Sequence, residues 1–183
     1  MHQILFLCIK RSWSIKIKMI PTQSKGCFRI TNESGIIRLM ESDFEWMGTY
    51  PDEFKRHEPA ITAVSGNVLI GGLGLGYITE QICKKPSVTS VTIVEISPEV
   101  IELVWPYIEK EKAEIIQDDI FNYLRKTERE FDFMCFDVHR DISFEQNQSV
   151  VKPLRRLAET KLPPDRIFQW RESDMKTFTK GLP

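Results

Sequence analysis

The chain has 183 residues, of which 42% are hydrophobic and 28% charged, and its 25 Lys plus Arg and 26 Asp plus Glu give a formal net charge of -1. This length suits one compact domain and excludes a long multidomain enzyme, and the composition excludes an intrinsically disordered chain. The near-neutral charge provides no overall positive field, so we expect no nucleic-acid partner. The cysteines lack C-x-x-C spacing and lie in or beside apolar runs, which predicts free thiols in a reducing compartment, no zinc site and no disulfide framework. They are Cys8, Cys27, Cys83 and Cys135.

The chain begins with a short apolar run over residues 4–9. No Lys or Arg precedes this run, no cleavage site follows it, and it is much shorter than the roughly 20 residues of a membrane span. We therefore expect no membrane association and a cytoplasmic location. Residues 14–19 alternate polar and apolar side chains, which predicts an edge strand, and Met19 is an alternative start to Met1.

Short strands with turn residues between them come next. Residues 27–30 and 36–40 predict a β-hairpin around the turn at residues 32–35, and residues 44–47 predict a third strand. A helix follows from Pro51 to about residue 65, because apolar side chains recur there at helical spacing. This pattern predicts an N-terminal β-rich extension over residues 1–50 and a second domain over residues 51–183.

From residue 68 onward, buried strands alternate with helices. We expect strands over residues 68–70, 91–94, 114–117, 131–137 and 166–170. We expect helices over residues 77–84, 98–110, 121–126 and 149–160. Such alternation is typical of a parallel sheet covered on both faces. The predicted fold class is therefore α/β, a Rossmann-like, doubly wound and mostly parallel sheet with an N-terminal β-hairpin extension.

Glycines and acids lie where these strands end. Gly72, Gly74 and Gly76 come directly after a buried strand and before a helix, and Glu95, 19 residues after Gly76, ends the next strand. Asp119 follows the third strand in the same way. The carboxyl ends of parallel strands meet in one crevice, where glycines admit a ligand and a carboxylate can bind ribose hydroxyls. Three alternatives stay open: a tight turn for the glycines, a solvated acid for Glu95, and a helix cap for Asp119 or its neighbour.

Four segments resemble successive motifs of class I S-adenosylmethionine-dependent methyltransferases. They are residues 68–76 (VLIGGLGLG), 94–98 (VEISP), 117–121 (QDDIF) and 131–137 (FDFMCFD). Within that superfamily the chain is most similar to the spermidine-synthase-like (aminopropyltransferase-like) branch. Ile70 stands where other methyltransferases usually carry an acid, VEISP is typical of the branch, and residues 57–59 (HEP) resemble the H-x-P ahead of its nucleotide domain. The resemblance covers about residues 66–140.

The resemblance implies S-adenosylmethionine as the cofactor. The expected contacts are Gly72, Gly74, Gly76, Glu95, Ile96, Asp119 and Ile120. The glycines would shape the loop against the methionine part, and Glu95 would bind the ribose hydroxyls. Adenine would lie between Ile96 and the pair Asp119 and Ile120.

The candidates for the acceptor side follow the fourth strand or precede the first. Asp137 ends the fourth strand, where a carboxylate can orient or deprotonate an amine or hydroxyl nucleophile. His139 is a candidate base, with an exposed loop residue as the alternative, and Asp141 is the third catalytic candidate. Tyr50 and His57 are acceptor-side candidates, with core packing and a backbone-bonded ring as their respective alternatives. We expect no metal.

Two departures from the branch decide the predicted reaction. Leu75 stands where aminopropyltransferases carry an Asp in the glycine loop, and residues 137–141 (DVHRD) replace their D-x-x-D. We therefore predict an S-adenosylmethionine-dependent methyltransferase acting on a small-molecule acceptor. The alternatives are a spermidine-synthase-like aminopropyltransferase using decarboxylated S-adenosylmethionine, a non-catalytic S-adenosylmethionine-binding module and, more distantly, a NAD-binding protein. The predicted strands are fewer than in a full methyltransferase sheet, so a homo-oligomer that completes the acceptor side is a further expectation.

Overall fold

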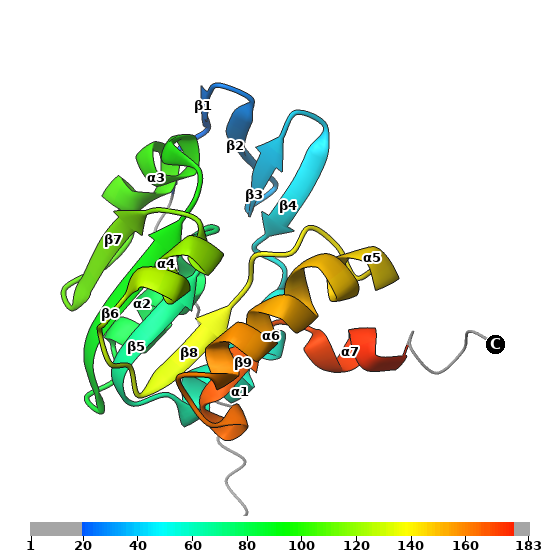
Figure 1. The fold of residues 1–183 in the computed structure, drawn as a ribbon. Helices are drawn as coiled ribbons and strands as arrows, with labels where there is room; N and C mark the ends of the chain where they lie inside the picture. Colours follow the sequence, from blue (N-terminus) through cyan, green and yellow to red (C-terminus); the bar gives the residue numbers. More distant parts are fainter. Residues whose placement is uncertain (1–19, 178–183) are drawn as a thin grey trace, which may run out of the picture.

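The structure, a computed structural model, describes residues 20–177, so the predictions for residues 4–9 and 14–19 lie outside the described residues. Two sheets organise this part of the chain (Figure 1). A four-stranded antiparallel sheet comes first, and a five-stranded parallel sheet with helices on both faces follows. None of the helices within residues 20–177 is long and apolar enough to cross a membrane.

The antiparallel sheet contains the predicted hairpin. Its strands are β1 (Gln23–Lys25), β2 (Phe28–Glu33), β3 (Ile36–Glu41) and β4 (Phe44–Gly48), in the order β1-β2-β3-β4. Ser34 and Gly35 both have positive φ, at 54° and 80°, as a tight turn between two twisted strands requires. The hairpin and the third strand are confirmed, whereas β1 was not predicted.

The parallel sheet has the order β7-β6-β5-β8-β9, and all its neighbouring strands are parallel. The strands are β5 (Gly66–Gly71), β6 (Val88–Glu95), β7 (Ala113–Gln117), β8 (Phe133–Phe136) and β9 (Ile167–Gln169). From β5 the chain continues to one side through β6 and β7, and it then crosses to the other side for β8 and β9. The strand order therefore reverses between β5 and β8, which is where ligands bind in open α/β sheets. The α/β fold class is confirmed.

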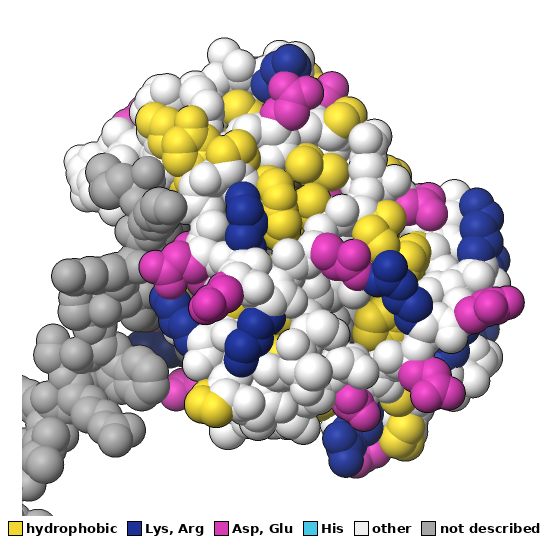
Figure 2. Space-filling model, turned by 90° about the vertical axis from the view of Figure 1, so that its left-hand side faces the viewer, with side chains coloured by type: hydrophobic (Ala, Val, Ile, Leu, Met, Phe, Trp, Pro, Cys, Tyr) yellow, Lys and Arg dark blue, Asp and Glu magenta, His cyan; other side chains and the backbone are white. Residues whose placement is uncertain are grey.

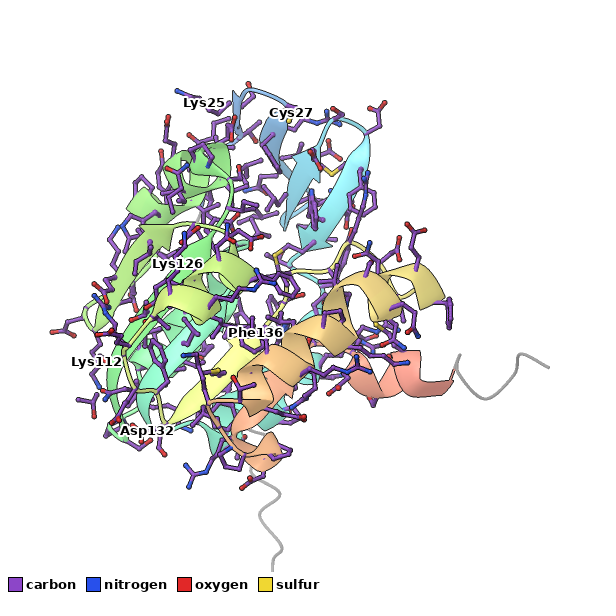
Figure 3. All side chains as sticks on the ribbon, in the orientation of Figure 1. Lys25, Cys27, Lys112, Lys126, Asp132 and Phe136 are labelled. Atoms are coloured by element: carbon purple, nitrogen blue, oxygen red, sulfur yellow. The ribbon has the colours of Figure 1, made fainter. Side chains whose placement is uncertain are left out.

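Helices cover both faces of the parallel sheet (Figure 1). They are α1 (Pro51–Ala63), α2 (Tyr77–Cys83), α3 (Pro98–Val104), α4 (Ile120–Lys126), α5 (Phe144–Gln146), α6 (Lys152–Glu159) and α7 (Glu172–Thr177). Side chains alternate between the faces along each strand. Ile70 and Cys135 pack in the core beneath α1, α2 and α3, and Leu69 and Phe136 pack in the core beneath α4 and α6. Figure 3 labels Phe136 on β8.

Two prolines change the predicted helix lengths. The helix expected over residues 98–110 leaves the α conformation after Val104 and continues as the short 3-10 helix Trp105–Tyr107. Pro106 explains the break, because it has no N–H for the helical ladder. The helix expected from residue 149 instead starts with α5 and passes through the π-helix Asn147–Val151 into α6. Pro153 lies in the first turn of α6, and the wider π turn accommodates its missing donor.

The antiparallel sheet packs against α3. Gln23 donates from Nε2 to the carbonyl of Leu103 at 2.8 Å, and Lys25 pairs with Glu102 at 2.7 Å on the surface. Lys25 and the exposed Cys27 lie at the outer end of this sheet (Figure 3). The face in Figure 2 intersperses Lys and Arg with Asp and Glu, and neither kind forms a continuous patch there. The packing on α3 places β4 across the carboxyl ends of the parallel strands.

Candidate active site

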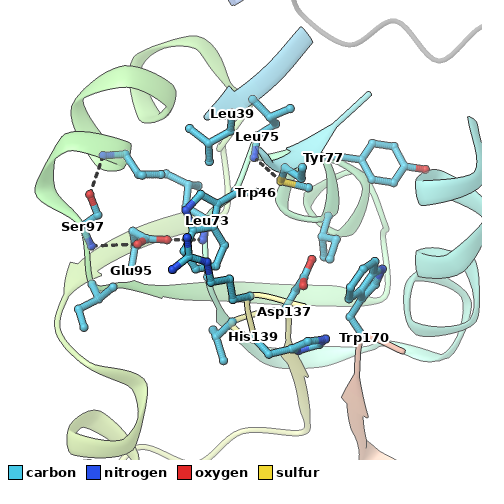
Figure 4. Close-up of a pocket in the computed structure, with 18 of the residues that line it drawn as sticks. Leu39, Trp46, Leu73, Leu75, Tyr77, Glu95, Ser97, Asp137, His139 and Trp170 are labelled. Atoms are coloured by element: carbon cyan, nitrogen blue, oxygen red, sulfur yellow. Dashed lines mark hydrogen bonds between the residues drawn. The ribbon is translucent and has the colours of Figure 1, made fainter. Parts of the chain in front are cut away.

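A pocket of about 580 Å³ lies at the carboxyl ends of the parallel strands (Figure 4). The glycine loop, the ends of β6 and β8, and the residues after β7 form its floor, while β4 and α1 form its walls. Its volume falls within the range of pockets that enclose small organic ligands. The crevice is therefore where the strand-end residues predict it.

The pocket brings together most of the predicted site residues. Those lining it are His57, Gly72, Gly74, Glu95, Ile96, Asp119, Ile120, Asp137, His139 and Asp141. Two candidates lie outside the lining. Gly76 precedes α2 with φ of 79°, and a side chain there would collide with Ile108. Tyr50 precedes α1, and its hydroxyl accepts a hydrogen bond from Arg38 Nε at 3.0 Å.

Close packing explains two glycines of the loop. A Cβ on Gly72, whose φ is 90°, would meet the carbonyl oxygen of Asp137. A Cβ on Gly74, whose φ is 51°, would collide with the sulfur of Met47 from β4. Both residues also have the positive φ that favours glycine. The loop therefore contacts both β4 and the segment after β8.

Glu95 has the most fixed carboxylate of the pocket. Its side chain is buried, Oε2 accepts from the Leu73 amide at 2.8 Å, and Oε1 accepts from the Ser97 amide at 2.9 Å (Figure 4). Burial raises the pKa of Glu95, although backbone amides oppose that shift. A carboxylate has about four lone-pair sites, so Glu95 can still accept hydrogen bonds from a ligand.

Ile96 and Asp119, which were predicted to contact adenine, differ in their contacts within the protein. Ile96 is 65% exposed although it is apolar, and it lines the pocket. Asp119 accepts from the amide of Asn122 at 3.0 Å and so caps α4, which is the alternative that the sequence left open. Asp118 accepts from the Asp119 amide at 2.8 Å. Ligand contacts of Ile96 and Asp119 stay predictions.

His57 contacts Asp137 on the opposite side of the pocket. The imidazole is 1% exposed, with Nδ1 2.9 Å from the carbonyl oxygen of Glu53 and Nε2 3.3 Å from Asp137 Oδ2. A carbonyl only accepts, so Nδ1 carries the hydrogen in that bond. The contact between His57 Nε2 and Asp137 Oδ2 is then a hydrogen bond only when one of these two atoms carries a proton. The ring of Trp170 lies nearly parallel to that of His57, with the ring centroids 6.2 Å apart.

His139 follows Asp137 and is buried rather than an exposed loop residue. It is 6% exposed, and its ring centroid lies 5.3 Å from that of Trp170. Among the described residues, Nε2 has no hydrogen-bond partner. Burial lowers the pKa of His139, although the charges of Asp137 and Asp141 oppose that shift.

Two carboxylates that line the pocket, Glu45 and Glu53, were not predicted from the sequence. Glu53 lies one helical turn before His57 on α1 and lines the pocket with Asp137 and Asp141. Burial raises the pKa of Glu53, and the charge of Asp137 raises it further. The spacing of four residues between Glu53 and His57 places them on one helix face and was the signal available in the sequence.

The comparison with known families decides the classification. Residues 53–179 match the family described as the spermine/spermidine synthase domain. The chain belongs to this family. The polyamine aminopropyltransferase 1 of Bacillus cereus is 35% identical over 135 residues, which are 67% of this chain and 45% of that protein. The polyamine aminopropyltransferase of Methanocaldococcus jannaschii is 30% identical over 142 residues, or 68% and 48% of the two chains.

The structural comparison supports the same fold. The spermidine synthase of Thermotoga maritima superimposes with a TM-score of 0.58 and 19% identity, covering 78% of this chain and 53% of that one. A precorrin 8w decarboxylase of Methanobacterium thermoautotrophicum has a TM-score of 0.51 with 15% identity, covering 75% of each chain. The family member described here spans less than half the length of the curated relatives above.

These findings correct the predicted reaction. The resemblance to the spermidine-synthase-like branch is confirmed, but the prediction of a methyltransferase is wrong, because the family and the curated relatives favour aminopropyl transfer. The methyltransferase prediction rested on two differences from the aminopropyltransferase branch, at Leu75 and at residues 137–141, rather than on the motifs shared with it. The family match extends beyond those motifs to residues 53–179.

Proposed function

We propose that this protein transfers an aminopropyl group from decarboxylated S-adenosylmethionine to a small amine. The observation that carries the proposal is the convergence of Glu53, Asp137 and Asp141 on one pocket of a family member. Amine acceptors are cationic near neutral pH, and carboxylates in a partly buried site attract them. The aromatic rings of Trp46, Tyr77 and Trp170, which also line the pocket, suit the methylene chain of such an amine.

The opposite side of the pocket fits the nucleoside part of the donor. Glu95 would accept hydrogen bonds from the ribose hydroxyls, and the exposed side chain of Ile96 would pack on adenine. Asp119 and Ile120 would lie along the adenine edge. The sulfonium of the donor supplies the activated propyl carbon and the leaving group.

Asp137 would accept the single proton that the reaction releases. The Asp137 carboxylate takes one proton from the ammonium nitrogen, which frees the nitrogen lone pair. That nitrogen then forms a bond to the propyl carbon, the carbon–sulfur bond breaks with its electrons moving to sulfur, and methylthioadenosine leaves. The protein otherwise contributes by holding amine and donor in line.

The direct test is a transfer assay with purified protein. Decarboxylated S-adenosylmethionine or S-adenosylmethionine is incubated with putrescine, cadaverine, agmatine or spermidine, and products are identified by mass spectrometry. We expect methylthioadenosine and an aminopropylated amine in equal amounts, from the decarboxylated donor only. Formation of S-adenosylhomocysteine, or binding of the donors without any product, would contradict the proposal.

A further inference from the structure

The glycine loop already uses most of its backbone donors within the protein. Four of the five amides of residues 72–76 donate to protein atoms at 2.8 to 3.1 Å. The pairs are Gly72 with Val94 O, Leu73 with Glu95 Oε2, Leu75 with Met47 Sδ, and Gly76 with Leu73 O. A loop of this kind binds an anion through such amides when they are free. This loop therefore has few free amides with which to bind an anionic group.

The partner of Leu75 differs from the others. It is the thioether of Met47, at 3.1 Å, which Figure 4 draws as the dashed line from Leu75 to sulfur. A thioether is a weak acceptor, so this amide would gain by exchanging it for a charged oxygen. Met47 comes from β4 of the other sheet, and its sulfur also fills the space that a side chain on Gly74 would occupy. Met47 therefore blocks both the amide and the room beside it.

S-adenosylmethionine and its decarboxylated form differ by one carboxylate at the end of the amino-acid tail. We propose that Met47 is a specificity-determining residue that excludes this carboxylate by covering the Leu75 amide and the surface of Gly74. The inference rests on the proposed function, because it concerns the choice between these two donors. The side chains of Leu73 and Leu75 line the pocket beside Met47 and add no charge.

The carboxylates across the pocket act in the same direction. The carbonyl of Asp137 packs against Gly72, so Asp137 lies next to the glycine loop. Glu53 lines the same pocket. Both repel an anionic tail. They stay unchanged when Met47 is replaced, so the contribution of Met47 can be measured separately.

The test compares dissociation constants by isothermal titration calorimetry. S-adenosylmethionine, decarboxylated S-adenosylmethionine and methylthioadenosine are titrated into the wild-type protein, Met47→Ala, Met47→Val and Met47→Leu. We expect wild type to prefer the decarboxylated donor. The ratio of the two donor constants should fall about tenfold in Met47→Ala and Met47→Val, because a charged hydrogen bond to the Leu75 amide becomes available. Met47→Leu still fills the space, so its ratio should stay within about twofold of wild type.

Controls separate the effect on specificity from an effect on folding. Met40→Ala changes a partly buried methionine of β3 that does not line the pocket, and it should leave the ratio unchanged. Methylthioadenosine has no charged tail, so its binding reports an intact site in each variant. Met47→Val retains the β propensity of the strand if the alanine variant folds poorly.

The outcomes distinguish this inference from the proposed function. A wild-type preference that Met47→Ala and Met47→Val both retain overturns the role of Met47 and leaves aminopropyl transfer standing. Equal binding of both donors by wild type also overturns the role of Met47. Failure of wild type to bind the decarboxylated donor overturns the proposed function, and the inference with it.

Discussion

On the β5, β6 and β7 side of the pocket, backbone amides hold the polar groups. Glu95 is fixed by the amides of Leu73 and Ser97, and four of the five amides of residues 72–76 have partners within the protein. On the β8 and β9 side, side chains of distant segments face one another: Asp137 meets His57 from α1, and both histidines lie against Trp170. Backbone amides fix the polar group of the first side, whereas the second side depends on how side chains of separate elements pack. Under the proposed function, the first side would bind the nucleoside of the donor and the second side would bind the amine acceptor.

The largest expected effect tests the acceptor side. Asp137→Asn removes the carboxylate that we propose as the proton acceptor, so kcat for aminopropyl transfer should fall about 10²- to 10⁴-fold. The dissociation constant of methylthioadenosine should change by less than about threefold, because the donor side does not use this carboxylate. Steady-state kinetics and calorimetry measure the two quantities. Comparable losses in kcat and in affinity for methylthioadenosine would contradict separate roles for the two sides of the pocket.

The next effect tests the donor side. Glu95→Ala removes the buried carboxylate and leaves the amides of Leu73 and Ser97 without it, so methylthioadenosine should bind about 100-fold more weakly. Glu102→Ala, an exposed carboxylate paired with Lys25, is the control and should bind normally.

The pH dependence of binding follows from the same carboxylate. Burial raises the pKa of Glu95, so it becomes protonated at a higher pH than an exposed glutamate. A protonated carboxyl accepts hydrogen bonds less well, and wild-type affinity for methylthioadenosine should decline as the pH falls toward 5. Titrations between pH 5 and 8 measure it, and a flat profile would contradict an ionised Glu95 as the ribose ligand.

A smaller effect concerns stability on the acceptor side. His57→Ala removes a buried ring with two partners and an aromatic stack, so the free energy of unfolding should fall by about 2 to 4 kcal/mol. Urea denaturation measures the change. Lys55→Ala, exposed on the same helix, is the control and should stay within about 0.5 kcal/mol. A loss below about 1 kcal/mol for His57→Ala would show that His57 is not fixed by these contacts.

The smallest effect is a pH dependence of stability at His139. Burial lowers the pKa of His139 in the folded protein, so the unfolded chain binds a proton there first as the pH falls. Stability from this residue is therefore present above the ordinary histidine range and is lost as the pH falls through it. Urea midpoints between pH 5 and 8 should decline more steeply for wild type than for His139→Gln. The neighbours Asp137, Asp141 and Arg171 are present in both proteins, so equal slopes would contradict a buried neutral His139.

The difference between the two sides also explains what the sequence could predict. Gly72, Glu95 and Asp119 were predictable because each lies at the carboxyl end of a strand, and a parallel sheet brings those ends together. Glu53 and Met47 come from α1 and β4, outside the alternating strands and helices. Their positions in the pocket depend on how these elements pack. The four-residue spacing of Glu53 and His57 indicates only that the two share a helix face.

The reaction was harder to predict than the fold. Leu75 and residues 137–141 departed from the expected acidic pattern, so the sequence favoured methyl transfer. The structure nevertheless adds a carboxylate from another element, because Glu53 of α1 lines the pocket together with Asp137 and Asp141. The acidic residues of a site come from several elements of the folded chain, so a single sequence motif identifies only some of them.

Cys135 is buried and Cys27 is exposed, so their thiols differ in reactivity toward oxidants. Cys135 lies in β8 two residues before Asp137, and burial raises the pKa of its thiol to about 12. Oxidation and alkylation proceed through the thiolate, which Cys135 scarcely forms at neutral pH. Among the cysteines that the structure describes, Cys27 is the exposed one, and it lies at the outer end of the N-terminal sheet. Peroxide would therefore modify the surface of this sheet while β8, which ends directly before Asp137, keeps its reduced thiol.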